Sequence, residues 1–315
     1  MAAYILRRVL TMVPLLLGLS VIVFGLVQLA PGDPATYFAG EDAPEAMRER
    51  IREQLGLDQP VPVQYWNWAT SAARGDLGTT FSYGRPVTEM IVQRLGPTLQ
   101  LQIAAITFSL IFAIPIGILS AIKRYSKLDH IVTSGSLFGL SMPDFWFGLL
   151  LMMIFSVHLG VLPAFGMGEG TLVERAPNFV MPVLTLGLST IPWYARFMRS
   201  SMIEVLGLDY VRTARAKGVR ERWVLMRHAL KVAILPVITI IGLTLPRLVG
   251  GSIIVESIFA WPGLGRLAFD AVVRSDYPLV MGIVLFAGAF VLLLNLVVDL
   301  IYTRLDPRIS FAARR

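Results

Sequence analysis

Long apolar runs, separated by short charged segments, are the feature of this sequence that most constrains its fold. Hydrophobic residues make up 55% of the 315 residues and charged residues only 16%. Several apolar runs exceed the roughly 18 residues expected of a membrane-spanning helix. Such a run enters lipid as a helix because a helix satisfies its own backbone hydrogen bonds. The chain is therefore predicted to be an all-α integral membrane protein.

Six apolar segments are long enough to be candidate spans. They run from about Val9 to Ala30, Thr98 to Ile122, Ile131 to Leu159, Val180 to Met198, Ala229 to Val255 and Leu279 to Tyr302. The first segment follows two arginines and resembles a secretory signal, but its apolar core of about twenty residues is longer than that of a signal peptide. It is predicted to be a retained anchor, and the even number of spans places both termini on one side.

The distribution of lysine and arginine residues predicts the orientation of these spans. With the amino terminus inside, the cytoplasmic segments hold 18 of the 28 basic residues. The first external segment, residues 31–96, has the opposite bias, with six basic residues against nine acidic ones. Since cytoplasmic loops carry the excess of positive charge, both termini are predicted to be cytoplasmic.

The predicted organisation has three parts. Residues 1–30 form an N-terminal transmembrane helix, residues 31–96 an extracytoplasmic insertion, and residues 97–315 the core transmembrane domain. Within the insertion, Pro44 to Gln54 is predicted to be a charge-paired helix and Pro62 to Ala73 an aromatic one. The aromatic residues of the insertion are typical of a membrane interface, with a ligand or partner contact as the alternative; they are Tyr65, Trp66 and Trp68.

Several function classes are excluded or disfavoured by what the sequence lacks. There are no cysteines, which removes disulfides, thiolate metal sites and cysteine nucleophiles. The formal net charge of +7 lies beside the predicted spans, where anionic lipid headgroups attract it, so no nucleic-acid partner is expected. The sequence contains no phosphate-binding loop, and its three histidines stand apart. No catalytic residue, metal site or bound cofactor is predicted, and any ATP hydrolysis must belong to another subunit.

A basic segment between two apolar spans is the strongest candidate for a functional element. It covers Glu204 to Lys231 and reads EVLGLDYVRTARAKGVRERWVLMRHALK. Asp209 is predicted to cap a short helix, and Gly218 to end it in a left-handed conformation. Val211 and Ala214 share one face of this helix, and three small residues leave room for the backbone of a partner: Thr213, Ala214 and Ala216. Charges surround the element at Arg212, Arg215 and Lys217. The alternative is an ordinary basic cytoplasmic loop.

Charged residues in or near the spans are a second set of candidates. Asp144 follows Pro143 near the middle of a predicted span, and Pro143 is expected to begin a new half-helix there. Arg247 and Glu256 lie in or just beyond the fifth span, and Asp299 is a weaker candidate in the sixth. These residues are predicted to line a translocation pathway or to form a structural ion pair, such as Asp144 with Arg247; the third alternative is that the spans are misplaced and the residues are exposed.

The sequence resembles a known family in several separate blocks. YVRTARAKG at Tyr210 to Gly218, with the RHALK that follows, resembles the EAA loop of binding-protein-dependent ABC importers, in the form typical of dipeptide and oligopeptide permeases. The other blocks that agree are LAPGDPA, GDLGTTFSYGRPV, RLGPTLQL, LPAFG, GGSIIVESIFAWPGLGRL and DYPLVMG. The resemblance covers nearly the whole chain, and the long first external segment is similar to that of the B-type subunit of the permease pair.

The resemblance implies a type I ABC importer permease with six spans. Its partners would be a second homologous permease in a heterodimer, two cytoplasmic ATPases that hold ATP and magnesium, and an extracytoplasmic peptide-binding protein. Residues 209–218, from Asp209 to Gly218 and including Tyr210, would dock on an ATPase. The location would be a bacterial or archaeal cytoplasmic membrane. Arg212, His228 and Lys231 depart from the general EAA pattern of the wider group.

Three other functions remain open from the sequence. A nickel or glutathione permease would belong to the same family, although nickel favours clustered ligands and the histidines are isolated. An ion-coupled secondary carrier would use Asp144, Arg247 and Asp299. The third function is a membrane scaffold without transport, but such a function would not explain why the spans contain charged residues and prolines.

Overall fold

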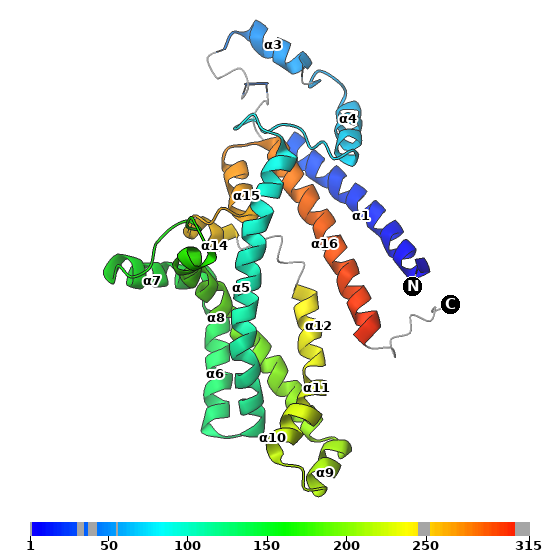
Figure 1. Cartoon of the computed structure of the whole chain (residues 1–315). Helices are drawn as coiled ribbons and strands as arrows, with labels where there is room; N and C mark the ends of the chain where they lie inside the picture. Colours follow the sequence, from blue (N-terminus) through cyan, green and yellow to red (C-terminus); the bar gives the residue numbers. More distant parts are fainter. Residues whose placement is uncertain (1, 30–34, 37–42, 55, 245–252, 306–315) are drawn as a thin grey trace.

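The structure, a computed structural model, describes residues 2–29, 35–36, 43–54, 56–244 and 253–305. Helices make up most of these ranges, and the described residues include no β-strand, only an isolated bridge between Thr79 and Pro86. Long helices run side by side, with a small helical appendage beyond one end and a helical hairpin at the other (Figure 1). The prediction of an all-helical chain is confirmed for the described residues.

Three described helices are long and apolar enough to cross a membrane, and a bent pair would make a fourth. The three lie in α1 (Ala2–Gln28), α5 (Val87–Ile122) and α16 (Tyr277–Leu305). The bent pair joins Glu221–Ala233 to α12 (Leu235–Thr244). The predicted span Val180 to Met198 lies inside α8 (Leu172–Leu206), a continuous helix with three internal prolines.

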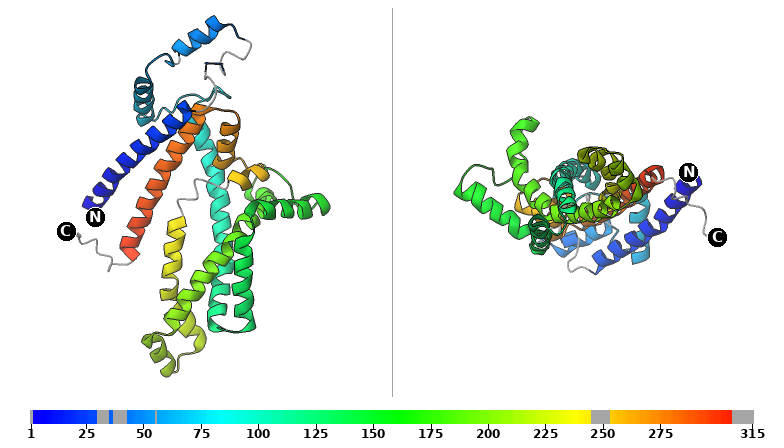
Figure 2. Two further views of the ribbon diagram at one scale, coloured as in Figure 1. Left: turned by 180° about the vertical axis from the view of Figure 1, so that it is seen from behind. Right: turned by 90° about the horizontal axis from the view of Figure 1, so that it is seen from below.

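The chain breaks in the middle of the third predicted span. Helix α6 (Lys127–Ser141) ends before Pro143, α7 (Asp144–Leu151) begins after it, and η1 (Met152–His158) continues α7 as a π-helix. Pro143 has the extended conformation of a residue before a helix, with ψ of 132°. Helix α7 projects sideways from the bundle in both views (Figures 1 and 2). A half-helix beginning at Pro143 is confirmed, whereas one continuous helix from Ile131 to Leu159 is wrong.

Helices α5 and α8 pack closely because small residues lie where they meet. A Cβ atom on Gly117 would lie 2.6 Å from the Met198 Cβ, and one on Gly187 would lie 2.5 Å from the Phe108 ring. The Ser109 hydroxyl donates to the Gly187 carbonyl at 2.9 Å. Small side chains and interhelical hydrogen bonds hold helices together in lipid, where the hydrophobic effect contributes little.

Helices α1 and α16 form a second packed pair, although most of the sequence separates them. A Cβ atom on Gly288 would lie 2.3 Å from a Leu19 methyl carbon, so the glycine permits the contact. Arg8 of α1 forms an ion pair with Asp299 of α16. The two helices lie side by side in both views (Figures 1 and 2).

The predicted insertion contains two helices, as expected. They are α3 (Glu45–Gln54) and α4 (Val61–Ala73). Tyr65 and Trp68 pack against Phe24 of α1, with ring centroids 5.5 and 5.7 Å away. Trp66 points outward and is 67% exposed. Two of the three aromatic residues of the insertion therefore attach α4 to α1.

The start of α16 holds the loop that precedes α5. Asp276 is fully buried, and its carboxylate accepts hydrogen bonds from the Phe81 and Ser82 amides at 3.0 and 2.9 Å. Two short helices lead into α16: α14 (Ile253–Ile258) and α15 (Leu264–Val273). The blocks that contain GTTFSYGRP and DYPLVMG are therefore joined in space.

Candidate functional site

The basic segment folds as a short helix, a tight turn and a second helical limb at one end of the bundle. The elements are α9 (Asp209–Ala216), α10 (Glu221–Trp223), η2 (Val224–Ala229) and α11 (Leu230–Ala233). Gly218 has φ of 77°, the left-handed conformation predicted for it. Its amide donates to the Arg215 carbonyl at 2.9 Å, and the Val219 amide donates to the Ala214 carbonyl at 3.3 Å. These two bonds form a Schellman motif, which ends the helix at a fixed angle.

The start of α9 differs from the prediction. Leu208 is the residue that precedes the helix, and no side chain caps the free amides. Asp209 is the first helical residue, its side chain is 97% exposed, and it lies 3.7 Å from Arg212. Asp209 as a capping residue is therefore wrong, although a carboxylate in the first turn still interacts favourably with the helix dipole.

The two faces of α9 have different surroundings. Val211 is fully buried and Ala214 is 7% exposed, and both pack in a core cluster with Met202 and Val224. Their shared face is confirmed, but this face contacts the chain itself, so Ala214 is not available to a partner. The exposed residues of the element are Asp209, Tyr210, Arg212, Thr213, Arg215, Ala216, Lys217 and Gly218.

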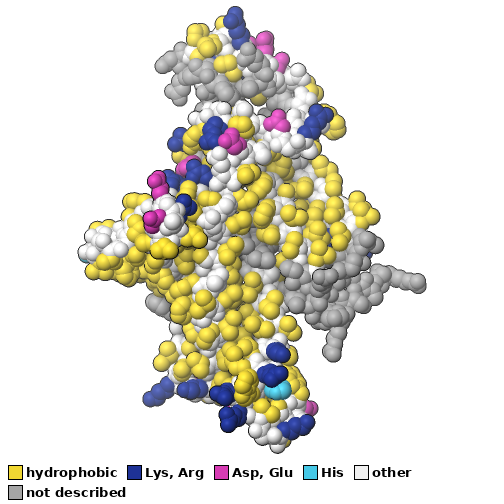
Figure 3. Space-filling model, in the orientation of Figure 1, with side chains coloured by type: hydrophobic (Ala, Val, Ile, Leu, Met, Phe, Trp, Pro, Cys, Tyr) yellow, Lys and Arg dark blue, Asp and Glu magenta, His cyan; other side chains and the backbone are white. Residues whose placement is uncertain are grey.

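Lys and Arg side chains gather at this end of the molecule, separated from the other charged end by an apolar belt (Figure 3).

An ion pair fixes the turn between α9 and α10. The Arg215 Nε and Nη2 atoms donate to the two carboxylate oxygens of Glu221 at 3.1 and 2.7 Å. Because a bidentate pair fixes both position and angle, the exposed basic face is held in one orientation.

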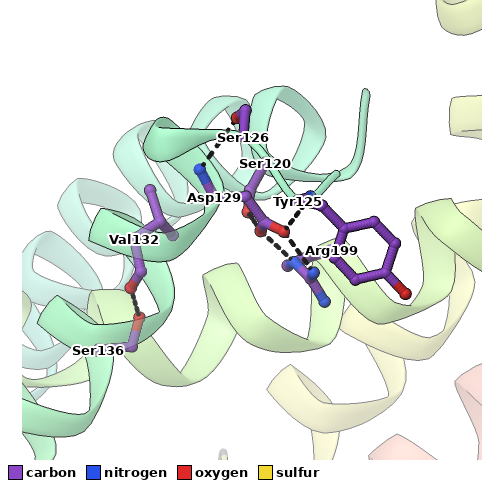
Figure 4. Close-up of polar contacts among 7 residues, drawn as sticks. All are labelled: Ser120, Tyr125, Ser126, Asp129, Val132, Ser136 and Arg199. Atoms are coloured by element: carbon purple, nitrogen blue, oxygen red, sulfur yellow. Dashed lines mark hydrogen bonds and ion pairs between the residues drawn. The ribbon is translucent and has the colours of Figure 1, made fainter. Parts of the chain in front are cut away.

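A buried ion pair lies nearby and was not expected from the sequence (Figure 4). Asp129 is 3% exposed and accepts two hydrogen bonds from Arg199 of α8, at 2.6 and 2.7 Å. Ser120 and the Tyr125 amide also donate to this carboxylate. Ser126 before α6 is a recognisable helix-capping residue, but no local pattern relates Asp129 to an arginine 70 residues away.

The candidate pathway residue Asp144 lines a cavity of about 520 Å³ between helices. The polar and aromatic lining residues are Gln102 of α5, Asp144 of α7, Thr244 of α12, and Ser189, Thr190, Trp193 and Tyr194 of α8. None of the lining residues that the structure describes is basic. Within the described part of the chain, the Asp144 carboxylate makes no hydrogen bond and no ion pair.

Glu256 has a different environment from Asp144. It is fully buried, and its carboxylate accepts hydrogen bonds from Thr98 at 2.9 Å and from the Arg266 amide at 3.0 Å. Thr98 in turn accepts a hydrogen bond from the Leu264 amide at 2.7 Å. Glu256 therefore joins α5, α14 and α15.

The other charged candidates are not brought together with Asp144. Arg247 lies outside the described residues, so an Asp144–Arg247 pair stays a prediction. Asp299, the weaker candidate, is paired with Arg8 near the end of α16. No group of three or more potential metal ligands occurs among the described residues.

Comparison with known proteins places the whole chain among transport membrane components. Residues 113–311 match the family described as "Binding-protein-dependent transport system inner membrane component", and residues 1–102 match its N-terminal family. The chain is 42% identical to the oligopeptide transport system permease protein AppB of Bacillus subtilis, covering 99% of this chain and 100% of that protein. It is 44% identical to the glutathione transport system permease protein GsiC of Salmonella choleraesuis, again over 99% and 100%.

Two solved structures have a similar fold. The MetNI methionine ABC transporter in inward-facing conformations matches with a TM-score of 0.54 at 20% identity, covering 69% of this chain and 96% of that one. An amino acid ABC transporter solved with histidines matches with a TM-score of 0.51 at 18% identity, covering 69% and 94%. With a family match over most of its length and full-length relatives above 40% identity, the chain belongs to the family of binding-protein-dependent transport system inner membrane components.

Proposed function

We propose that this chain is the membrane-spanning permease subunit of an ATP-driven importer that carries dipeptides and oligopeptides into the cytoplasm. The support is its family and its full-length similarity to permeases of oligopeptide and glutathione transport systems. The chain would cross a bacterial or archaeal cytoplasmic membrane six times, with both termini inside. A second homologous permease, two cytoplasmic ATPases holding ATP and magnesium, and an extracytoplasmic peptide-binding protein would complete the importer.

The observation that carries the docking part of this proposal is the exposed basic face of α9. Its buried face packs on the core, the Schellman motif ends the helix, and the Arg215–Glu221 pair fixes the turn. A rigid helix that protrudes from the bundle is suited to receive a mechanical displacement from an ATPase. The exposed residues of the segment 209–218 would dock on that ATPase, while the cavity beside Asp144 would lie on the cargo pathway.

The experiment is gentle-detergent purification of the chain from its own membranes, with mass spectrometry of what accompanies it. We expect two ATPase subunits and a second permease. Gly218→Arg should weaken this association and uncouple ATP hydrolysis from transport, because a left-handed residue with a side chain is strained by about 1–2 kcal/mol. A chain that is recovered alone and transports a solute alone contradicts the proposal.

Gly218→Asn is the matched control for the turn. Asparagine tolerates the left-handed conformation, and a Cβ at this position meets nothing within 4 Å. Coupling should therefore survive in Gly218→Asn and fail in Gly218→Arg. Equal loss in both variants would show that the side chain blocks the docking surface, whereas equal retention would remove Gly218 from the docking element.

Competition experiments distinguish the two peptide-like cargoes suggested by the relatives. Uptake of a labelled dipeptide should be inhibited by other short peptides if the chain serves a general peptide importer. Inhibition by glutathione alone would favour a glutathione system, since the chain is 44% identical to the glutathione permease and 42% identical to the oligopeptide permease.

A further inference from the structure

We infer that the cavity lined by Asp144 is a binding site for the free α-ammonium group of the cargo, so the permease itself distinguishes cargo with a charged amino terminus. This inference rests on the proposed import function for the identity of the cargo. Beyond the proposed function, it names the cargo group that the permease binds, the α-ammonium, and the residue that determines this specificity, Asp144. Without such a site the permease would pass any cargo that the binding protein delivers.

The charge of the cavity is the first reason. Among the described residues that line the cavity, Asp144 is the single carboxylate and none is basic. Its carboxylate is unpaired within the described structure. An ionised carboxylate at membrane depth is costly unless it is wetted or paired, and a cationic ligand supplies a partner. The site is therefore matched to a cation that enters and leaves.

The neutral lining residues indicate what kind of cation fits. The Tyr194 hydroxyl lies 3.2 Å from the Thr244 hydroxyl across the cavity wall, and the Ser189 hydroxyl donates to the Leu186 carbonyl at 3.0 Å. Ser189 therefore retains oxygen lone pairs that accept hydrogen bonds. A primary ammonium donates three hydrogen bonds, so it is suited to a carboxylate surrounded by hydroxyl oxygens.

An aromatic wall and the cavity size support a small organic cation over a bare metal ion. Trp193 lines the cavity and is 40% exposed, and the Arg196 guanidinium lies 5.8 Å from its ring centroid, so this ring already has a cation as a neighbour, as expected of an indole face. Gln102 of α5 also lines the cavity, and its side-chain amide can both donate hydrogen bonds to a peptide group and accept them from it. A volume of about 520 Å³ lies within the usual range for small-molecule sites, roughly 300–1,000 Å³.

The first test is binding to the purified permease with the subunits that accompany it. The probe is a dipeptide amide with a free ammonium, compared with its N-acetylated form, which keeps the shape and removes the charge. The readout is tryptophan fluorescence, with Trp193→Phe subtracted because the chain has six tryptophans. We expect a saturable change with the free-amine probe that weakens about tenfold in Asp144→Asn, the effect of losing one charge-assisted hydrogen bond.

The second test is transport by the reconstituted importer, using one peptide with a free amino group and one N-acetylated peptide. The measured quantity is the transport rate of the free-amine peptide divided by that of the acetylated peptide. Because the same binding protein delivers both peptides in both variants, a change of this ratio between wild type and Asp144→Asn reports the selectivity of the permease. We expect Asp144→Asn to slow the free-amine peptide about tenfold more than the acetylated one, with Asp144→Glu restoring the preference. Asp58→Asn, an exposed residue of the insertion, should change neither rate.

The outcomes separate the two proposals. If no peptide is transported but the ammonium probe binds through Asp144, the import function fails and the cation site stands. If transport proceeds and Asp144→Asn affects both peptides equally, or both probes bind equally, the ammonium site is overturned. If Asp144→Asn no longer assembles with its partners, and Asp144→Glu does not restore both assembly and the preference, Asp144 has a structural role and the inference is also wrong.

Discussion

At the scale of single residues, Asp129 is a buried carboxylate on which contacts from separate segments converge. It receives hydrogen bonds from Arg199, Ser120 and the Tyr125 amide, and these link the α5–α6 loop to α8. The Arg199 guanidinium holds the pKa of Asp129 well below its usual range. Removal of one partner from such a pair leaves a charge without its counterpart and is strongly destabilising.

We expect Asp129→Asn to lower the free energy of unfolding by about 3 kcal/mol at neutral pH, the low end for buried pairs because Arg199 is partly exposed. The measurement is thermal unfolding of the purified protein in detergent. Glu89→Gln, in the exposed Arg85–Glu89 pair, is the control and should cost less than about 1 kcal/mol. Similar losses in both variants would contradict a special role for Asp129.

The same pair predicts a pH dependence with a definite sign. Since the folded-state pKa of Asp129 is lowered, its contribution is complete above the unfolded-state pKa of about 3.9 and is lost as the pH falls further, through the folded-state pKa. The stability difference between wild type and Asp129→Asn should therefore be constant from pH 7 to about 5 and shrink below about 4. A difference that grows on acidification would rule out this origin.

Local chemistry explains which single residues could be predicted from the sequence. The left-handed conformation of Gly218 follows from its place after a helical pattern, so it was predictable. The role of Asp209 was mispredicted because the helix begins one residue earlier than expected. Leu208 is the residue that precedes the helix, and Asp209 is its first residue. The Asp129–Arg199 pair depends on how α6 packs against α8, and no pattern within either segment contains that information.

At the scale of helices, the junction of α5, α14 and α15 depends on glycine as much as on Glu256. A Cβ atom on Gly263 would lie 2.4 Å from a Glu256 carboxylate oxygen and 2.5 Å from the Thr98 hydroxyl. Gly265 has a similar restriction, 2.9 Å from the same carboxylate. Two glycines in the described part of this block, residues 253–267, are therefore explained by packing around one buried carboxylate.

Gly263→Ala should destabilise the protein by about 1–3 kcal/mol, because the added methyl group displaces Glu256 from its hydrogen bonds. Gly96→Ala, in α5 close to Thr98, is the matched control. A Cβ there meets nothing within 4 Å, so alanine should stabilise the helix by about 1 kcal/mol. The melting temperature should fall in Gly263→Ala and rise in Gly96→Ala. If it falls in neither variant, the close packing at this junction is contradicted.

The predicted spans show where helix prediction succeeded and where it failed. The helices that contain the predicted first, second and sixth spans pass as membrane spans by length and apolar character. The third failed as a single helix because apolar composition alone does not reveal a change of direction at Met142 and Pro143. The restriction that proline imposes on the preceding residue was the local feature that indicated it.

At the scale of the whole molecule, the two charged ends and the apolar belt between them give a testable orientation (Figure 3). The sequence has no cysteine, so a single introduced cysteine is labelled without background. Glu169→Cys, in the loop before α8, should react with a membrane-impermeant maleimide on intact cells. Arg220→Cys, between α9 and α10, should react only after the membrane is opened, and reaction of Arg220→Cys in intact cells would reverse the proposed topology.

The pairing of α1 with α16 has a consequence for biosynthesis. Membrane helices enter the bilayer in the order of their translation, so α1 meets lipid long before Asp299 and Gly288 have been made. The helix is suited to this interval because its long apolar surface is stable in lipid without a neighbour. Contact between Leu19 and Gly288, and pairing of Arg8 with Asp299, become possible only when translation has passed α16. A chain truncated before α16 would therefore leave this face of α1, including Arg8, without its partner helix.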